Sequence, residues 1–110
     1  MHRVVLHVPE ESRVDQALRN ARNLLDDLPG TVEVVLVLNG GAVEALAPAS
    51  AHAGFIRELQ ERGVRVAACA RSLRKHGLGD GPLIEGVTTV AGGVTEAVRL
   101  QADGFAYLRP

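Results

Sequence analysis

The chain has very few of the residues that cross-link proteins or build aromatic cores. Among its 110 residues there are one cysteine, one tyrosine, two phenylalanines and no tryptophan. One cysteine excludes an internal disulfide and cannot by itself complete a zinc site. With aromatic residues at 3% of the chain, the core must consist of valine, leucine, isoleucine and alanine. That composition suits a valine-rich sheet covered by helices.

The chain also lacks an excess of charge of one sign and a long apolar run. Its formal net charge is −1, so no overall field favours nucleic acid or an anionic membrane as a partner. No run approaches the roughly 18 apolar residues of a membrane span, and residues 1–8 are too short for a cleavable signal segment. We therefore expect one domain, residues 1–110, in the cytoplasm, where its cysteine stays reduced.

Several well-known site motifs are missing. No GxGxxG or GxxxxGK[ST] sequence supports a dinucleotide or P-loop site, and no GxSxG sequence supports a hydrolase. The histidines His2, His7, His52 and His76 have no metal-ligand spacing, so we expect no metal and no cofactor. We expect His7 to be a satisfied strand histidine, whereas His76 could border the cysteine thiol as its proton donor.

What the chain does contain is a regular alternation of strand and helix patterns. Valine-rich runs predict strands, and apolar residues spaced three and four apart predict helices. The expected strands are 3–8, 32–38, 64–68, 87–90 and 105–108, and the expected helices are 12–28, 42–46, about ten residues after Ser50, 71–76 and 94–102. Strands that alternate with helices form parallel sheets. The sequence predicts an α/β fold, a three-layer α/β/α sandwich with a five-stranded parallel sheet.

Serine and glycine residues mark the expected helix ends. Ser12, with Asp15 three residues later, is expected to cap the first helix. Ser50 is expected to cap the helix that follows it, and Gly63 to end that helix.

The turns after the strands hold the candidate site, because ligands of open parallel sheets bind beyond the carboxyl ends of the strands. The candidate catalytic residue is Cys69, since helix N–H groups and nearby cations favour the reactive thiolate. Glycine pairs can bring backbone N–H groups close to an anion. The candidate binding residues are Asn39, Gly40, Gly41, Ala70, Arg71, Ser72, Arg74, Gly92 and Gly93.

Each of these features has a plainer interpretation. A free cysteine is most often a small buried hydrophobe, and glycine pairs often serve only as tight turns. Asn39 could serve only to adopt a left-handed turn. Arg71, Arg74 and Lys75 could form a solvated helix face.

Five sequence blocks, in this order, resemble the DsrE/DsrF-like superfamily, in particular its branch of small single-domain proteins. The blocks span nearly the whole chain and read VVLHV, RVDQALRNARNLLDDL, VEVVLVLNGGAVEAL, HAGFIRELQERGVRVAACARSL and GVTEAVRLQADGFAYLRP. The resemblance implies a five-stranded parallel sheet and assembly into trimers or hexamers. Better-studied relatives relay sulfane sulfur as a persulfide on a cysteine after a central strand, and Cys69 lies at a comparable place.

The leading hypothesis is therefore a sulfur carrier, in which Cys69 is the nucleophile and bears the persulfide. Backbone N–H groups of residues 70–72, with Arg71, Arg74 or Lys75, would stabilise the thiolate. Because the chain has no CxxC pair, its sulfur must leave to a thiol on another protein or to a small thiol.

Two alternatives belong to other classes of function. In the first, the glycine pairs and Asn39 bind a small anion or a nucleotide in a regulatory module. In the second, the chain is a non-catalytic subunit of an oligomer. Residues 40–55 are small and carry few charges, so we expect part of an oligomer interface there, including Leu46 and Phe55.

Overall fold

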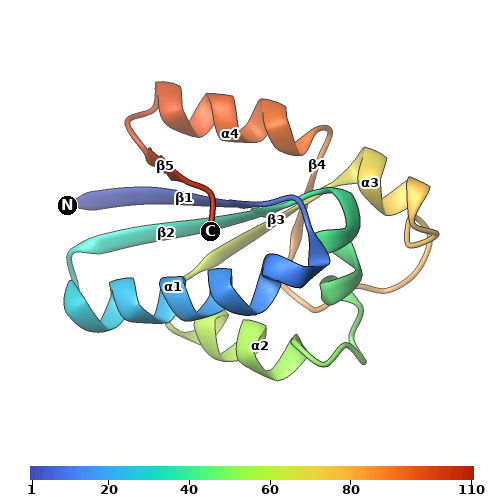
Figure 1. The fold of residues 1–110 in the computed structure, drawn as a ribbon, viewed down its shortest axis with the longest axis horizontal. Coiled ribbons are helices and arrows are strands. Elements are labelled where there is room, and N and C mark those ends of the chain that lie inside the picture. Colours follow the sequence, from blue (N-terminus) through green and yellow to red (C-terminus); the bar gives the residue numbers. More distant parts are fainter.

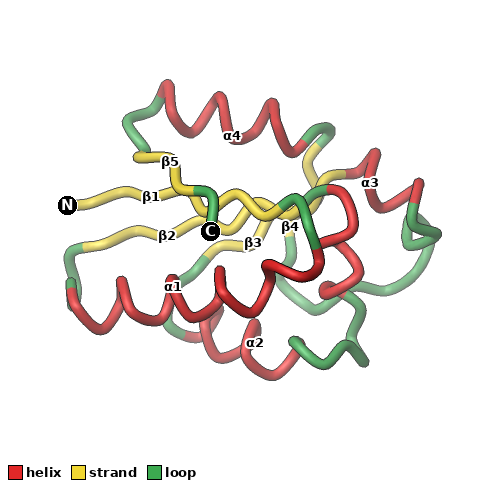
Figure 2. The backbone as a smooth tube through the Cα atoms, in the orientation of Figure 1, coloured by secondary structure: helices red, strands yellow, loops and turns green.

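The computed structural model describes residues 1–110 and contains five parallel strands in one sheet (Figures 1 and 2). The strands lie in the order β4-β3-β2-β1-β5. Their bounds are His2–Val8 for β1, Val32–Leu38 for β2, Arg65–Cys69 for β3, Thr88–Val90 for β4 and Ala106–Leu108 for β5. The predicted five-stranded parallel sheet is confirmed, and each strand lies within two residues of its predicted bounds.

Helices cover both faces of the sheet and make the predicted three layers (Figure 1). Helices α1 and α2 lie on one face, α4 lies on the other, and α3 stands at the carboxyl ends of the strands. Their bounds are Val14–Asp27 for α1, Ala53–Glu61 for α2, Ala70–Lys75 for α3 and Gly93–Ala102 for α4. Two 3-10 segments, η1 at Glu11–Arg13 and η2 at Gly40–Leu46, follow β1 and β2. None of the helices combines the length and the apolar composition needed to cross a membrane.

The core is divided by the sheet into two unequal parts. A cluster of 22 buried residues lies on the α1/α2 face and includes Leu36 and Leu38. A cluster of 6 lies under α4 and includes Val35 and Val37. Successive residues of a strand point to opposite faces, so β2 contributes to both clusters. This explains why its sequence is a continuous apolar run.

The prediction that Ser12 caps the first helix is wrong. Ser12 lies inside the 3-10 turn η1, whose Arg13 N–H donates to Glu10 O at 3.1 Å, and its side chain makes no cap hydrogen bond. The helix therefore begins only at Val14. Asp15, expected to complete the capping box, instead pairs with Arg19 one turn later, at 2.9 Å.

The end signals around α2 are partly confirmed. Ser50 Oγ accepts the N–H of His52 at 3.2 Å and donates to Ala45 O at 2.6 Å. It therefore shapes the turn before α2, while His52 itself occupies the cap position without a side-chain bond. Gly63 follows α2 with a φ of +96°, the left-handed conformation expected of a helix stop.

The predicted interface residue Leu46 is not on the surface. Its side chain is fully buried in the chain's own core, together with Ala42, Val43 and Ala45. Residues 40–46 carry few charges because η2 packs into the core. The prediction that Leu46 forms part of an oligomer interface is therefore wrong. Phe55 is half-buried, and the guanidinium of Arg22 lies over its ring, 5.0 Å from the centroid.

Candidate functional site

Cys69 ends β3 and directly precedes α3, as predicted. Its side chain lies on the α4 face of the sheet and is 5% exposed. A Cβ on Gly93 would lie 3.4 Å from Cys69 Cβ and only 2.9 Å from Asn39 Cβ. The first residue of α4 must therefore be glycine for the thiol and the asparagine to pack against its backbone.

Hydrogen-bond donors surround the thiol. Burial raises the pKa of Cys69, but four neighbouring donors act in the opposite direction and lower it below its ordinary value. The donors are the hydroxyl and the backbone N–H of Ser72, and the backbone N–H groups of Gly93 and Arg71. Each of them stabilises the thiolate more than the thiol. None of these donors is a cationic group. The turn of helix that carries Arg71 and Arg74 therefore stabilises the thiolate through its backbone N–H groups and not through its charged side chains.

Ser72 also receives a hydrogen bond that improves it as a donor. The N–H of Gly40 donates to Ser72 Oγ at 2.8 Å, and a hydroxyl that accepts one bond donates the next more strongly. Gly40 has a φ of +54°, whereas Asn39 is extended with a φ of −138°. The left-handed turn therefore belongs to Gly40, and the plainer interpretation of Asn39 as the turn residue is wrong.

Removing the Ser72 hydroxyl is expected to raise the pKa of Cys69. Because the folded-state pKa lies below that of the unfolded chain, the free energy of unfolding should increase as the pH rises between the two values. The variant Ser72→Ala should shrink that increase. Thiolate ultraviolet absorbance, titrated against Cys69→Ala as the blank, measures the pKa without a need for reagent access. An unchanged midpoint in Ser72→Ala would contradict this assignment.

The Arg71 side chain reaches the turn that precedes α4. Its guanidinium Nη1 would be 2.9 Å from a Cβ on Gly92, in the turn between β4 and α4. The side chain is exposed and has no ion-pair partner in the chain. A free guanidinium there can attract an anionic sulfur compound.

The structure brings together seven of the predicted site residues and leaves three apart. The seven are Cys69, Asn39, Gly40, Arg71, Ser72, Gly92 and Gly93. A Cβ on Gly41 would face the His76 ring, at 3.9 Å. His76 in turn lies 3.2 Å from Glu44, so it has an acidic partner of its own.

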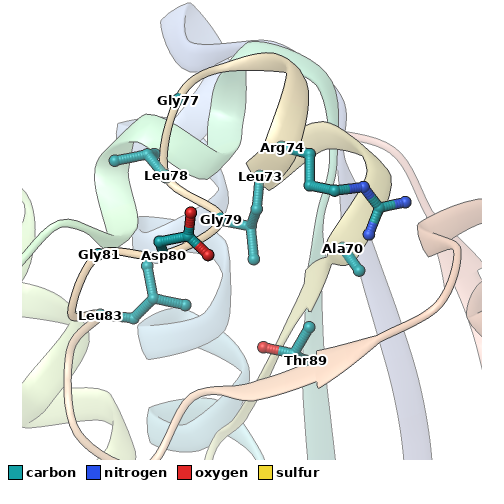
Figure 3. A pocket seen from close by; sticks show the side chains of 10 residues that line it. All are labelled: Ala70, Leu73, Arg74, Gly77, Leu78, Gly79, Asp80, Gly81, Leu83 and Thr89. Atoms are coloured by element: carbon teal, nitrogen blue, oxygen red, sulfur yellow. The ribbon is translucent and has the colours of Figure 1, made fainter.

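The other two, Ala70 and Arg74, line a cavity of about 620 Å³. Figure 3 shows it between α3, the 77–83 loop and β4, with Arg74 and Asp80 as its charged side chains. Cys69 is not among its lining residues. Thr89, which lines it, pairs with Ala68 on the α1/α2 face of the sheet, whereas Cys69 lies on the α4 face. This cavity is therefore separate from the thiol.

His7 and Tyr107 also lie beside this site, and the sequence did not predict this. His7 Nδ1 lies 2.5 Å from Tyr107 Oη, and His7 Nε2 lies 2.9 Å from Asn39 Oδ1. His7 is the one polar residue in the apolar run of residues 4–8, and a buried polar group requires partners. That signal predicted that His7 has hydrogen-bond partners, which is confirmed. It did not predict that one of these partners is Asn39.

Comparison with known proteins identifies one family. The family model that matches, over residues 5–110, is described as the DsrE/DsrF-like family. A protein of unknown function, MTH1491 from Methanobacterium thermoautotrophicum, is 41% identical, with 100% of each chain covered and a TM-score of 0.93. The ychN protein from E. coli is 21% identical with 100% of each chain covered, and its TM-score of 0.81 shows a shared fold. No curated protein matches the chain.

Proposed function

The chain belongs to the DsrE/DsrF-like family, a family associated with sulfur relay, and from this premise we propose that it carries sulfane sulfur as a persulfide on Cys69. The observation that carries the proposal is the set of donors around the thiol, namely one hydroxyl and three backbone N–H groups. The thiolate is the nucleophile in sulfur transfer, and donors that stabilise an anion at Sγ raise its population.

The chemistry balances without a second cysteine or an external oxidant. In the first step the Cys69 thiolate attacks the terminal sulfur of a donor persulfide, R–S–SH. A bond forms between Sγ and that sulfur, the S–S bond of the donor breaks, and the donor leaves as its thiolate. In the second step an acceptor thiolate attacks the terminal sulfur, and Cys69 leaves as a thiolate. The protein returns to its starting state.

The burial of Cys69 restricts which donors can react. With 5% of the residue exposed, a broad reagent cannot reach Sγ, whereas the end of a persulfide or polysulfide chain is narrow and anionic. The guanidinium of Arg71, folded over Gly92, is placed to attract that anion. These features favour a small linear sulfane donor.

The test is uptake of sulfur by the purified, reduced protein. After exposure to inorganic polysulfide, intact-protein mass spectrometry should show an added mass of one sulfur atom, and peptide mapping should place it on Cys69. A small thiol should remove it. Absence of the adduct in a folded protein whose thiol titrates normally would overturn the proposal.

We also propose that the chain assembles with copies of itself. Val94 and Val98 are 60% and 59% exposed, and they lie one turn apart on the same side of α4. We expect light scattering to give a trimer or hexamer for the wild type and a smaller species for the double variant Val94→Asp, Val98→Asp. A wild-type monomer at micromolar concentration would contradict self-association.

A further inference from the structure

Three hydrogen-bonded side chains form a line across the α4 face of the sheet, and the line ends beside Cys69. Tyr107 bonds to His7, and His7 bonds to Asn39. The three residues come from β5, from β1 and from the end of β2, which are neighbours in the sheet. The strand register places each residue diagonally opposite the next, within reach of an aromatic or long side chain.

The chemistry of the three groups fixes the direction of these bonds. Asn39 Oδ1 can only accept, so the proton between it and the ring belongs to His7 Nε2. In a neutral ring with a proton on Nε2, Nδ1 has a lone pair and accepts the hydroxyl proton of Tyr107. His7 is 9% exposed, so little water reaches its ring. The bond from the Tyr107 hydroxyl to Nδ1 thus favours the Nε2–H tautomer, and that tautomer orients the carboxamide.

The carboxamide nitrogen is the unused end of this line. Asn39 Nδ2 makes no hydrogen bond within the chain, and no buried side-chain nitrogen or oxygen lacks a partner. Nδ2 is therefore an accessible donor. Asn39 and Cys69 both pack against Gly93 from neighbouring strands, so the Asn39 side chain and the thiol lie on the same face of the sheet, at the start of α4.

We propose that Tyr107 and His7 are positioning residues that hold the Asn39 carboxamide with its N–H₂ group toward a second sulfur bound to Cys69. Asn39 donates to that terminal sulfur and stabilises the negative charge that it bears as a persulfide. The donors already described stabilise negative charge on Sγ itself, whereas Asn39 donates to the terminal sulfur, the atom that is transferred. The inference rests on the proposed function, but it can be tested separately.

The first test places a second sulfur on Cys69 by reagent, whatever the protein carries in the cell. The Cys69 thiolate displaces methanesulfinate from methyl methanethiolsulfonate, and the new Sγ–S bond holds a methylthio group. In the wild type, NMR should show the Nε2–H tautomer of His7 and a shift of the Asn39 side-chain amide signals on modification. In Tyr107→Phe, which removes only the hydroxyl, the Nδ1–H tautomer should appear and the Asn39 shift should shrink.

The second test measures how fast a small thiol removes the methylthio group. The variant Asn39→Asp keeps the size of the side chain but replaces the donor with a carboxylate, and removal should slow on the order of tenfold. Tyr107→Phe should slow removal less, because it acts through His7. Leu108→Ala is the matched control, since this exposed neighbour pairs with Leu6, a residue of the opposite core cluster, and its rate should equal that of the wild type.

The outcomes separate this inference from the proposed function. The positioning role would be overturned if the Asn39 amide signals did not shift when the methylthio group is added. It would also be overturned if Asn39→Asp lost the methylthio group as fast as the wild type. A wild type that takes up no sulfur from polysulfide would overturn the carrier function, while the methylthio experiments would still decide the role of Asn39.

Discussion

Replacing Cys69 with serine is expected to abolish sulfur uptake from polysulfide and to leave the fold in place. The serine hydroxyl is not ionised at neutral pH, so it cannot attack a sulfane sulfur, and the chain has no second cysteine. The four donors around the position can still bond to an oxygen. The free energy of unfolding should therefore change by only about 1 kcal/mol. Intact-protein mass spectrometry measures the uptake, and urea unfolding measures the stability.

Cys69→Ala serves as the matched control for this result. It also removes the nucleophile, but it leaves the surrounding donors without a partner. Both variants should lack the sulfur adduct, and the alanine variant should be the less stable of the two if water does not reach the donors. Sulfur retained by folded Cys69→Ser would refute covalent carriage and would favour a bound sulfur anion, as in the anion-binding alternative.

Replacing Gly40 with alanine is expected to give the largest loss of stability at the site. Gly40 has a φ of +54°, and a Cβ there would lie 2.4 Å from the backbone oxygen of Pro9. An alanine must therefore shift backbone as well as strain its own conformation. We expect a loss of about 2–4 kcal/mol. Because the Gly40 N–H also holds Ser72 Oγ, the pKa of Cys69 should rise at the same time.

Gly54→Ala provides the matched control for that loss. Gly54 lies in α2 with open space around its Cβ position and no positive φ. Since alanine has the better helix propensity, this variant should be more stable than the wild type by roughly 0.5–1 kcal/mol. Urea unfolding with equal slopes compares the two variants. A Gly40→Ala variant as stable as Gly54→Ala would show that the turn after β2 adapts to a side chain.

The sequence predicted the elements well because their signals are local. The run of residues 32–38 matches β2 at both ends, since a strand buried on both faces needs an unbroken apolar sequence. Helix starts were less predictable. Ser12 and Asp15 have the spacing of a capping box, but the chain enters α1 through the 3-10 turn η1, and this choice depends on how residues 9–13 pack.

The candidate site was predicted in part for a topological reason. Turns after parallel strands meet at one edge of the sheet, so Cys69, Asn39 and Gly93 could be grouped before their contacts were known. The face of the sheet could not be assigned in the same way. Arg74 and Ala70 follow Cys69 closely in sequence, yet they line a cavity on the opposite face.

The three layers, the parallel sheet and the place of the only cysteine at a strand end were predictable from the sequence, because hydrophobic periodicity and turn residues act within a few residues. The strand order, and with it the neighbours of the thiol, depended on how distant strands pair. Periodicity shows which residues of a strand share a face, but not which strand lies beside it. Tyr107 meets His7, 100 residues away, because β5 pairs with β1, and that pairing connects the C-terminal strand to the side chains beside Cys69.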